Sequence, residues 1–169
     1  MTVNWNRQNF SGEDPEQHPA VAALRKNPAT PVKEVAIFRG EVTAVISPEH
    51  SIEALTLLRD DPALAFDLLA DVTAVHWPER KGAEFDVVYQ LYSHGTRMRI
   101  RVKVPLADGQ EVRSAVPLWA TADWLEREVY DMFGIPFAGH PDQRRIVNPP
   151  NFEGHPLRKE FPVQGRVRW

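Results

Sequence analysis

The chain contains no cysteine among its 169 residues. This absence excludes disulfide bonds, cysteine-ligated iron–sulfur clusters and cysteine nucleophiles within the chain. Long hydrophobic runs are missing as well. The mean hydropathy is −0.39, and no segment approaches the roughly 18 apolar residues that a membrane-spanning helix needs. The N-terminus lacks the basic and then apolar pattern of a signal peptide. We therefore expect any contact with a membrane to be made through other proteins.

Cofactor motifs are also absent. The sequence has no glycine-rich phosphate loop and no dinucleotide fingerprint, so NADH and flavin binding are not expected. The residues that could serve as metal ligands or acid–base groups are Glu126, Glu128, Asp131, His140 and His155. No two histidines share a helix face, and both of these sit in Gly-His-Pro turns, where a hydrogen bond to a backbone or partner group is expected. The sequence thus predicts no catalytic residue, no cofactor and no metal site.

The first 133 residues carry the pattern of one folded domain. Residues 1–14 read as a flexible N-terminus. Hydrophobic periodicity predicts helices at 18–26, 51–59 and 62–69, strands at 34–38, 42–46, 70–76, 85–92 and 97–104, and a short extended piece at 113–118. The short hairpin connections require antiparallel pairs. We predict a two-layer α+β domain over residues 15–133, with a mixed, mostly antiparallel sheet and helices on one face.

Basic and apolar residues alternate strictly between positions 97 and 104. A period of two predicts a strand with one face in the core and one basic face outward. Proteins that bind single-stranded nucleic acids usually interleave aromatic side chains with basic ones, and this row has none. We interpret the basic face as a solvated strand face, and expect no nucleic-acid partner.

A short, charge-rich helix is predicted at 123–133. Asp123 suits the N-cap, with Glu126 completing a capping-box-like pair, and Gly134 suits the left-handed position that ends a helix. Helical spacing then predicts an apolar stripe of Leu125, Val129, Met132 and Phe133, and an opposite polar face that includes Glu126, Arg127 and Asp131.

Glu128 lies at the edge of this apolar stripe. A buried carboxylate costs several kcal/mol, on the order expected for a buried charge, unless a cation meets it. We therefore expect Glu128 to be paired with backbone donors or with an arginine, the candidates being Arg144, Arg145 and Arg158.

Residues 134–169 contain six prolines and four glycines and show no helical or strand period. Apolar residues nevertheless recur along this segment, which is unlike a disordered chain. Its last 30 residues hold six basic and three acidic side chains, a formal charge of +3; since the whole chain carries −3, residues 1–139 carry −6. We predict an extended, basic, partner-binding arm over 134–169 that buries its apolar anchors only against another protein and is protease-sensitive in isolation.

Three motifs follow one another through the helix and the arm. They are Glu126-Arg-Glu with Asp131-Met-Phe-Gly134, then Gly139-His-Pro141 with Arg144-Arg145, then Gly154-His-Pro-Leu-Arg-Lys-Glu-Phe-Pro162. Together they resemble the signature of one subunit family of the proton-pumping NADH–quinone oxidoreductase, respiratory complex I: the small hydrophilic subunit of its quinone-reducing module. Upstream segments at 59–69, 71–74 and 101–105 are also similar to that family. Asn148–Asn151 departs from it, because the family usually has an acidic stretch there.

The resemblance implies a non-redox structural subunit of the peripheral arm, and so a non-catalytic part of an enzyme. FMN, iron–sulfur clusters and quinone sites would belong to other subunits. The partners would be the large quinone-site subunit and other subunits of the peripheral arm, and the complex would hold the chain at the cytoplasmic face of the bacterial inner membrane. The residues implied in partner binding are Glu126, Arg127, Glu128, Asp131, His140, Arg144, Arg145, His155, Arg158 and Lys159.

Two other readings stay open at this point. One is the equivalent subunit of a related membrane-bound hydrogenase or ferredoxin-accepting complex, which would share the motifs. The other is a free-standing metal-binding or nucleic-acid-binding protein.

Overall fold

The computed structural model describes residues 14–162 and Gln164. Its order is α1 (Pro19–Lys26), β1 (Val32–Phe38), β2 (Glu41–Ile46), α2 (Ser51–Asp60), β3 (Leu68–His76), β4 (Phe85–Tyr92), β5 (Arg99–Leu106), β6 (Val112–Arg113), α3 (Ala122–Phe133) and β7 (Phe137–Ala138). The flexible N-terminus predicted for residues 1–14 lies outside this range except for Asp14.

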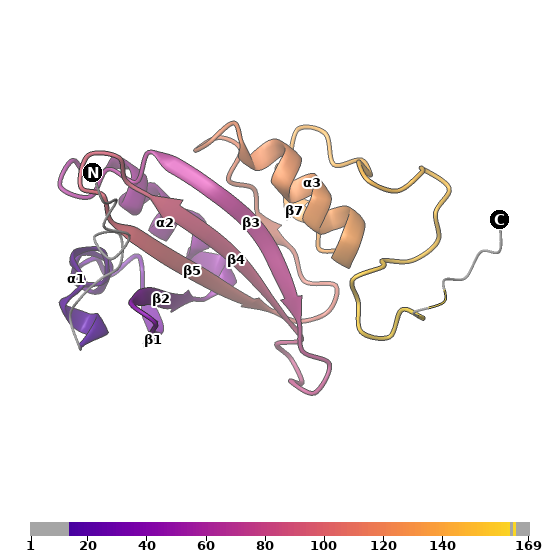
Figure 1. Cartoon of the computed structure of the whole chain (residues 1–169), viewed down its shortest axis with the longest axis horizontal. Coiled ribbons are helices and arrows are strands. Elements are labelled where there is room, and N and C mark those ends of the chain that lie inside the picture. The colour runs from indigo at the N-terminus through magenta and orange to yellow at the C-terminus, as the bar shows by residue number, and fades with distance from the viewer. Residues whose placement is uncertain (1–13, 163, 165–169) are drawn as a thin grey trace, which may run out of the picture.

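A five-stranded sheet in the order β1-β2-β5-β4-β3 forms the centre of the molecule (Figure 1). The pairs β1–β2, β4–β5 and β3–β4 are antiparallel, and only β2–β5 is parallel. The predicted α+β class with a mixed, mostly antiparallel sheet is therefore confirmed. β6 and β7 form a separate two-stranded parallel ribbon that ties the segment after α3 to the segment before it.

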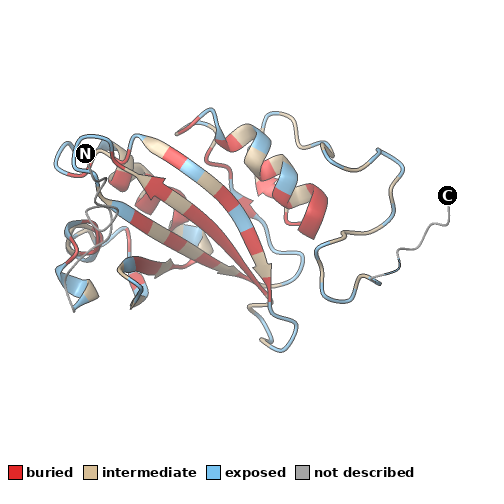
Figure 2. Ribbon diagram, viewed as in Figure 1, coloured by how far each residue is buried: buried red, intermediate tan, exposed pale blue. Residues whose placement is uncertain are grey.

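The core lies on one face of this sheet. Ile100, Val102 and Val104 of β5 are buried, whereas Arg101 and Lys103 between them are half-buried on the other face. The alternation of burial along the strands is visible as banding in Figure 2. Leu24, Leu55, Leu58, Val129 and Phe133 from the three helices join the strands' apolar side chains in one core cluster. The predicted division into a core face and a basic face is thus confirmed over β5.

Arg97 does not belong to the strand. It takes a left-handed conformation, with φ 59°, in the turn before β5, which begins at Arg99. The outward basic side chains have partners on the sheet: Arg101 pairs with Glu41, and the Arg99 guanidinium lies 5.0 Å from the centre of the Tyr92 ring.

The helix predicted at 62–69 is wrong. α2 ends at Asp60, and the chain turns at 62–64. Ala65 then adopts a positive φ of 43°, which no helix accommodates. Leu64 and Phe66 are buried there, and Leu68 already pairs with Tyr92 of β4. Short apolar runs fit a strand or a helix equally well by composition, and here pairing across the sheet decides the outcome.

α3 ends where the sequence predicts. Gly134 takes φ 75°, and its N–H donates to the Tyr130 carbonyl at 2.8 Å. Only glycine fits easily, for two reasons. A side chain disfavours that φ, and a Cβ at this position would come within 2.5 Å of the His155 ring.

Candidate functional site

α3 and the arm, residues 134–169, form the candidate site. Figure 1 shows the arm continuing from α3 at the end of the molecule away from α1. The structure places the ten predicted partner-binding residues on these two segments. Glu126, Arg127, Glu128 and Asp131 lie on α3, and His140, Arg144, Arg145, His155, Arg158 and Lys159 lie in the arm. Most of them contact one another or the chain's own backbone.

The Asp131 carboxylate fastens the arm to α3. The side chain is completely buried, not exposed as helical spacing predicted. Its Oδ2 accepts hydrogen bonds from the backbone N–H groups of residues 146, 147 and 148 at 3.0, 2.8 and 2.8 Å. Its Oδ1 accepts from Arg145 Nη1 at 2.6 Å and from the Asn148 side-chain amide at 3.0 Å. Burial alone would raise the pKa of Asp131, but the Asn148 and Arg145 donors hold it well below its usual range.

The arm also caps the C-terminal end of α3. Helix ends leave carbonyl groups without intrahelical donors. The Asp131 carbonyl lies 2.9 Å from His155 Nδ1, the Met132 carbonyl accepts from the Leu157 N–H at 3.1 Å, and the Phe133 carbonyl accepts from Arg158 Nε at 2.6 Å. A guanidinium at this end is also favoured by the helix dipole. The third motif therefore completes the helix that the first motif begins.

His140 holds the start of the arm against the start of α3. Its side chain is fully buried. Nδ1 accepts from the Asp142 N–H at 3.0 Å, which leaves Nε2 as the protonated nitrogen of the neutral ring. Nε2 lies 3.1 Å from the Asp123 carbonyl and donates to it. Both Gly-His-Pro histidines thus hydrogen-bond backbone groups, as expected for such turns.

Glu126 is a correction to the predicted helix face. α3 begins at Ala122, so Asp123 is not the N-cap and Glu126 completes no capping box. Ala122, Glu126, Val129 and Phe133 are spaced i, i+4, i+7 and i+11, which puts the carboxylate in the middle of the buried stripe. It accepts from Ser114 Oγ and the Ala115 N–H, both at 2.6 Å. Burial raises the pKa of Glu126 to about 7, against the lowering effect of these two donors.

Glu128 is the opposite correction. It is exposed on α3, and within the part of the chain that the structure describes it has no hydrogen bond or ion pair. The three arginines proposed as its partners are engaged elsewhere. Arg144 pairs with Asp142, Arg145 with Asp131, and Arg158 with Asp108. The prediction failed because the true stripe is rotated toward Glu126.

The arm's anchors are only partly as predicted. Ile135 and Phe137 are buried in the chain's own core, at 3% and 2% exposure, so they need no other protein. Val147 and Leu157, in contrast, remain 63% and 52% exposed. The last predicted anchor, Trp169, lies outside the described residues. The arm is therefore an appendage of the domain whose outer side keeps exposed apolar groups.

A basic pocket of about 390 Å³ opens on this outer side. α3 and the arm both line it, with Arg127, Tyr130, Gln143, Arg144, Arg145 and Pro150. Arg127 Nε donates to the Arg144 carbonyl, and its guanidinium lies 5.3 Å from the Trp124 ring centre. Trp124 is 63% exposed. Exposed tryptophan beside arginine is typical of the centres of protein interfaces.

Sequence reasoning missed several contributors to this site. Asp108 pairs with Arg158 in a bidentate contact at 2.8 and 3.1 Å, and His76 Nδ1 accepts from the Lys159 N–H at 3.0 Å. Both come from parts of the chain remote in sequence, so no local pattern marks them. Asn148 carried a signal, as part of a departure from the family pattern. Its amide donates to Asp131, where a carboxylate would repel.

The described residues also bear on metal binding and membrane insertion. Residues 14–162 and 164 contain no group of three His, Cys, Asp or Glu side chains placed to hold a metal ion. Within the same range no helix is both long and apolar enough to cross a membrane.

Comparison with known protein families decides the assignment. The model of the family described as respiratory-chain NADH dehydrogenase, 30 Kd subunit, matches residues 44–167. The chain belongs to this family. The resemblance seen in the three motifs is thereby confirmed.

Three similar proteins are named as one and the same subunit of NADH-quinone oxidoreductase. One from Methylorubrum extorquens is 50% identical over 136 residues, which cover 80% of this chain and 62% of that protein. One from Agrobacterium fabrum is 48% identical over 131 residues, covering 78% and 65%. One from Brucella abortus is 47% identical over 144 residues, covering 85% and 71%. The chain thus spans less than two thirds of the length of the first two.

Two solved structures are similar in fold. A trypsin-resistant fragment (1–134) of Nqo5 has a TM-score of 0.58 and 30% identity, and the match covers 72% of this chain and 95% of that one. A structure of the membrane-bound sulfane sulfur reductase, an archaeal respiratory membrane complex, has a TM-score of 0.68 at 24% identity, covering 84% and 82%. At that identity the second likeness shows the fold alone.

Proposed function

We propose that the chain is a non-redox structural subunit in the peripheral arm of a proton-translocating NADH–quinone oxidoreductase. It docks the large quinone-site subunit and supports electron transfer from NADH through FMN and iron–sulfur clusters, all carried by other subunits, to quinone. Family membership and the names of the 46–50% identical relatives support this assignment. Those relatives also favour it over the equivalent subunit of a hydrogenase or ferredoxin-accepting complex.

The observation that carries the proposal is the double use of the α3–arm motifs. Inward-facing members, Asp131, His155 and Arg158, hold the arm on α3. Outward-facing members, Arg127 and Arg144, are left on the surface around the basic pocket with Trp124. A rigid surface loses little conformational entropy on binding, which favours docking. We expect the partner to present acidic groups to these arginines.

The chain itself is proposed to have no catalytic residue and no cofactor. The purified protein should be colourless and should neither oxidise NADH nor reduce quinone. Stoichiometric iron or NADH turnover by the chain alone would contradict this. We further propose that it meets the membrane only through the complex, on the cytoplasmic face.

Charge reversal of the outward arginines tests the docking role. The chain and the large quinone-site subunit from the same genome are co-expressed, and their affinity is measured after purification. Arg127→Glu with Arg144→Glu should weaken binding by about 100-fold, and the corresponding alanine pair by about tenfold. The matched control is Lys81→Glu, an exposed lysine in the β3–β4 loop.

The folded state of each variant is checked by its unfolding midpoint in isolation. Arg144 is 77% exposed in its side chain, so the reversal should leave that midpoint nearly unchanged. Equal binding by the control and the double variant would show that α3 and the arm do not form the docking surface.

A further inference from the structure

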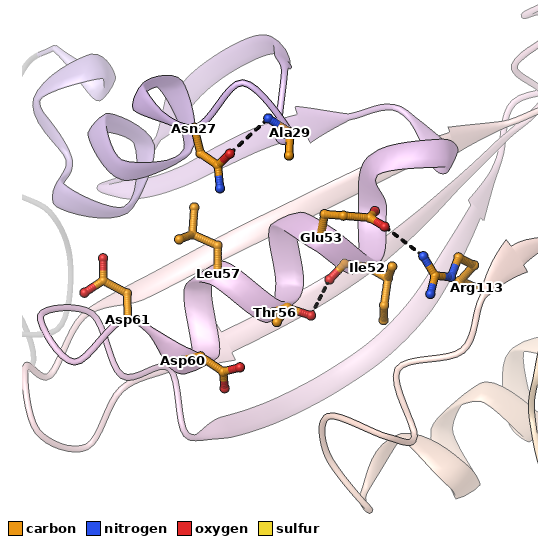
Figure 3. Close-up of a pocket in the computed structure, with 9 residues that line it drawn as sticks. All are labelled: Asn27, Ala29, Ile52, Glu53, Thr56, Leu57, Asp60, Asp61 and Arg113. Carbon is orange, nitrogen blue, oxygen red and sulfur yellow. Dashed lines mark hydrogen bonds and ion pairs between the residues drawn. The ribbon is translucent and has the colours of Figure 1, made fainter.

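A second surface lies apart from the α3–arm site. It is a groove of about 680 Å³ between α2 and the loop that follows α1 (Figure 3). Asn27 and Ala29 supply one wall, and residues 52–61 of α2 and its C-cap supply the other. Arg113 of β6 stands at one end, beside Glu53. The groove shares no lining residue with the basic pocket.

The middle of the groove is apolar. Ile52, Leu57 and Ala29 line it. Thr56 adds little polarity, because its hydroxyl donates to the Ile52 carbonyl at 2.7 Å within the helix. The Asn27 side chain accepts from the Ala29 N–H at 2.9 Å and so braces the opposite wall. The groove is therefore built from braced elements and offers apolar contact area.

The rim of the groove is acidic. Glu53, Asp60 and Asp61 line it with a single cation, Arg113. That cation is already held by Glu53 Oε1 at 2.8 Å. The other oxygen, Oε2, is shielded from solvent and accepts no hydrogen bond from any described residue. A buried acceptor without a donor is costly, and an incoming N–H group would remove that cost.

We propose that this groove is a second docking surface, and that it receives an amphipathic segment of another subunit carrying an apolar residue flanked by lysine or arginine. The apolar floor would take the apolar residue, and the carboxylates would take the cations. The inference rests on the proposed function in one respect, since it requires that the chain work inside a complex. The groove's acidity sets it apart from the basic α3–arm surface, so the two surfaces select different partners.

Site-specific photocrosslinking in the purified, assembled complex tests the inference. Ala29 is exposed on the groove wall and is replaced by p-benzoylphenylalanine. The matched control carries the same residue at Ala63, which is exposed outside the groove. After irradiation, mass spectrometry should find position 29, and not position 63, linked to a segment of another subunit that has an apolar residue next to lysine or arginine.

A charge variant adds a second readout. Asp61→Lys should lower the crosslinking yield from position 29 by at least about tenfold. Glu111→Lys, a reversal of an exposed acid outside the groove, should leave the yield unchanged. A segment captured equally well by both variants would overturn the charge argument.

The remaining outcomes are equally decisive. Linkage to residues 1–13 of the chain itself, to a second copy, to lipid or to an acidic segment would overturn the proposal, as would no linkage in an intact complex. In each of these cases the docking role of α3 and the arm would stand. Failure of the chain to enter any complex would overturn both.

Discussion

Two carboxylates five residues apart on one helix show how environment sets ionisation. Glu126 and Asp131 are both completely buried, and burial disfavours the charged form of each. Asp131 collects five donors, one of them a guanidinium, and its pKa falls below the usual range. Glu126 has only two neutral donors, so burial prevails and its pKa rises. Donor number and charge, rather than burial alone, separate the two residues.

Glu126 should make stability depend on pH. Its folded pKa of about 7 lies above the ordinary 4.5, so the native state holds a proton that the unfolded state releases. Stability should therefore be highest at low pH and fall as pH rises from about 4.5 to 7, by at most about 3 kcal/mol. Urea unfolding of the wild type and Glu126→Gln across this range measures the difference.

Glutamine mimics the protonated acid, so Glu126→Gln should remove this fall and be the more stable protein at pH 8. The comparison also cancels His18, whose pKa burial lowers and which acts in the opposite direction. A wild type and variant with parallel pH profiles would show that Glu126 keeps an ordinary pKa.

Glu128 should tolerate replacement. Because it is exposed and unpaired among the described residues, Glu128→Ala should change the unfolding free energy of the isolated chain by less than about 1 kcal/mol. The measurement is urea unfolding at pH 7. A loss of 3–5 kcal/mol, roughly the cost of stripping a buried ion pair of one partner, would restore the original prediction of a buried pair.

The contrast between these residues marks a limit of sequence reasoning. The motif identified the right segment, and its two ends were predicted to within a residue. The rotation of the helix was not, because a stripe containing a buried glutamate has a weaker apolar signal than one drawn through Leu125. Only Ser114 and Ala115, which come from a different segment, make Glu126 acceptable in the core.

At the scale of elements, the arm is the C-terminal cap of α3 as well as a surface. Three successive carbonyls of the helix end on arm donors, and the Asp131 side chain binds three successive arm amides. Capping and fastening therefore depend on one another. Loss of either should release the arm while the sheet persists.

Asp131→Asn should release the arm. One carboxylate oxygen becomes an NH₂ group, which must face either the three backbone N–H groups or Arg145, and no orientation satisfies both sides. Trypsin should then cut at Arg144, Arg145, Arg158 or Lys159 at least about tenfold faster than in the wild type. Asp142→Asn, which removes only a surface pair, is the control. Equal cleavage of both variants would exclude Asp131 as the fastener.

The strands were more predictable than the connections between them. The 34–38 and 42–46 hairpin, β4 and the alternation in β5 follow from local period alone. The parallel β2–β5 pair and the β6–β7 ribbon join segments that are far apart in the sequence, so no local pattern specifies them. The same reason explains why Asp108 and His76 were not predicted as supports of the arm.

At the scale of the whole molecule, charge is divided between two surfaces. The arm brings arginines to the basic pocket at one end, and α2 presents carboxylates around the groove. A chain with opposite charges on separate faces can bridge two unlike partners, which suits a structural subunit. The fold supports this division, because the sheet joins both surfaces through a single core.

The position of a truncation should decide whether the body survives without the arm. The sequence alone placed the boundary at Gly134. In the structure, Ile135 and Phe137 are core residues, β7 pairs with β6, and His140 is buried against Asp123. Removing two buried apolar side chains costs about 2–5 kcal/mol each, which approaches the whole stability of a typical domain, about 5–15 kcal/mol.

A chain ending at Gly134 should therefore be largely unfolded or strongly destabilised, whereas one ending at Pro141 should keep a cooperative unfolding transition. Circular dichroism and urea unfolding distinguish them. Neither should bind the large quinone-site subunit, since both lack Arg144 and Arg145. If the shorter chain were as stable as the longer one, residues 135–141 would not belong to the domain. If the longer one bound its partner as well as the full chain does, the docking surface would lie elsewhere.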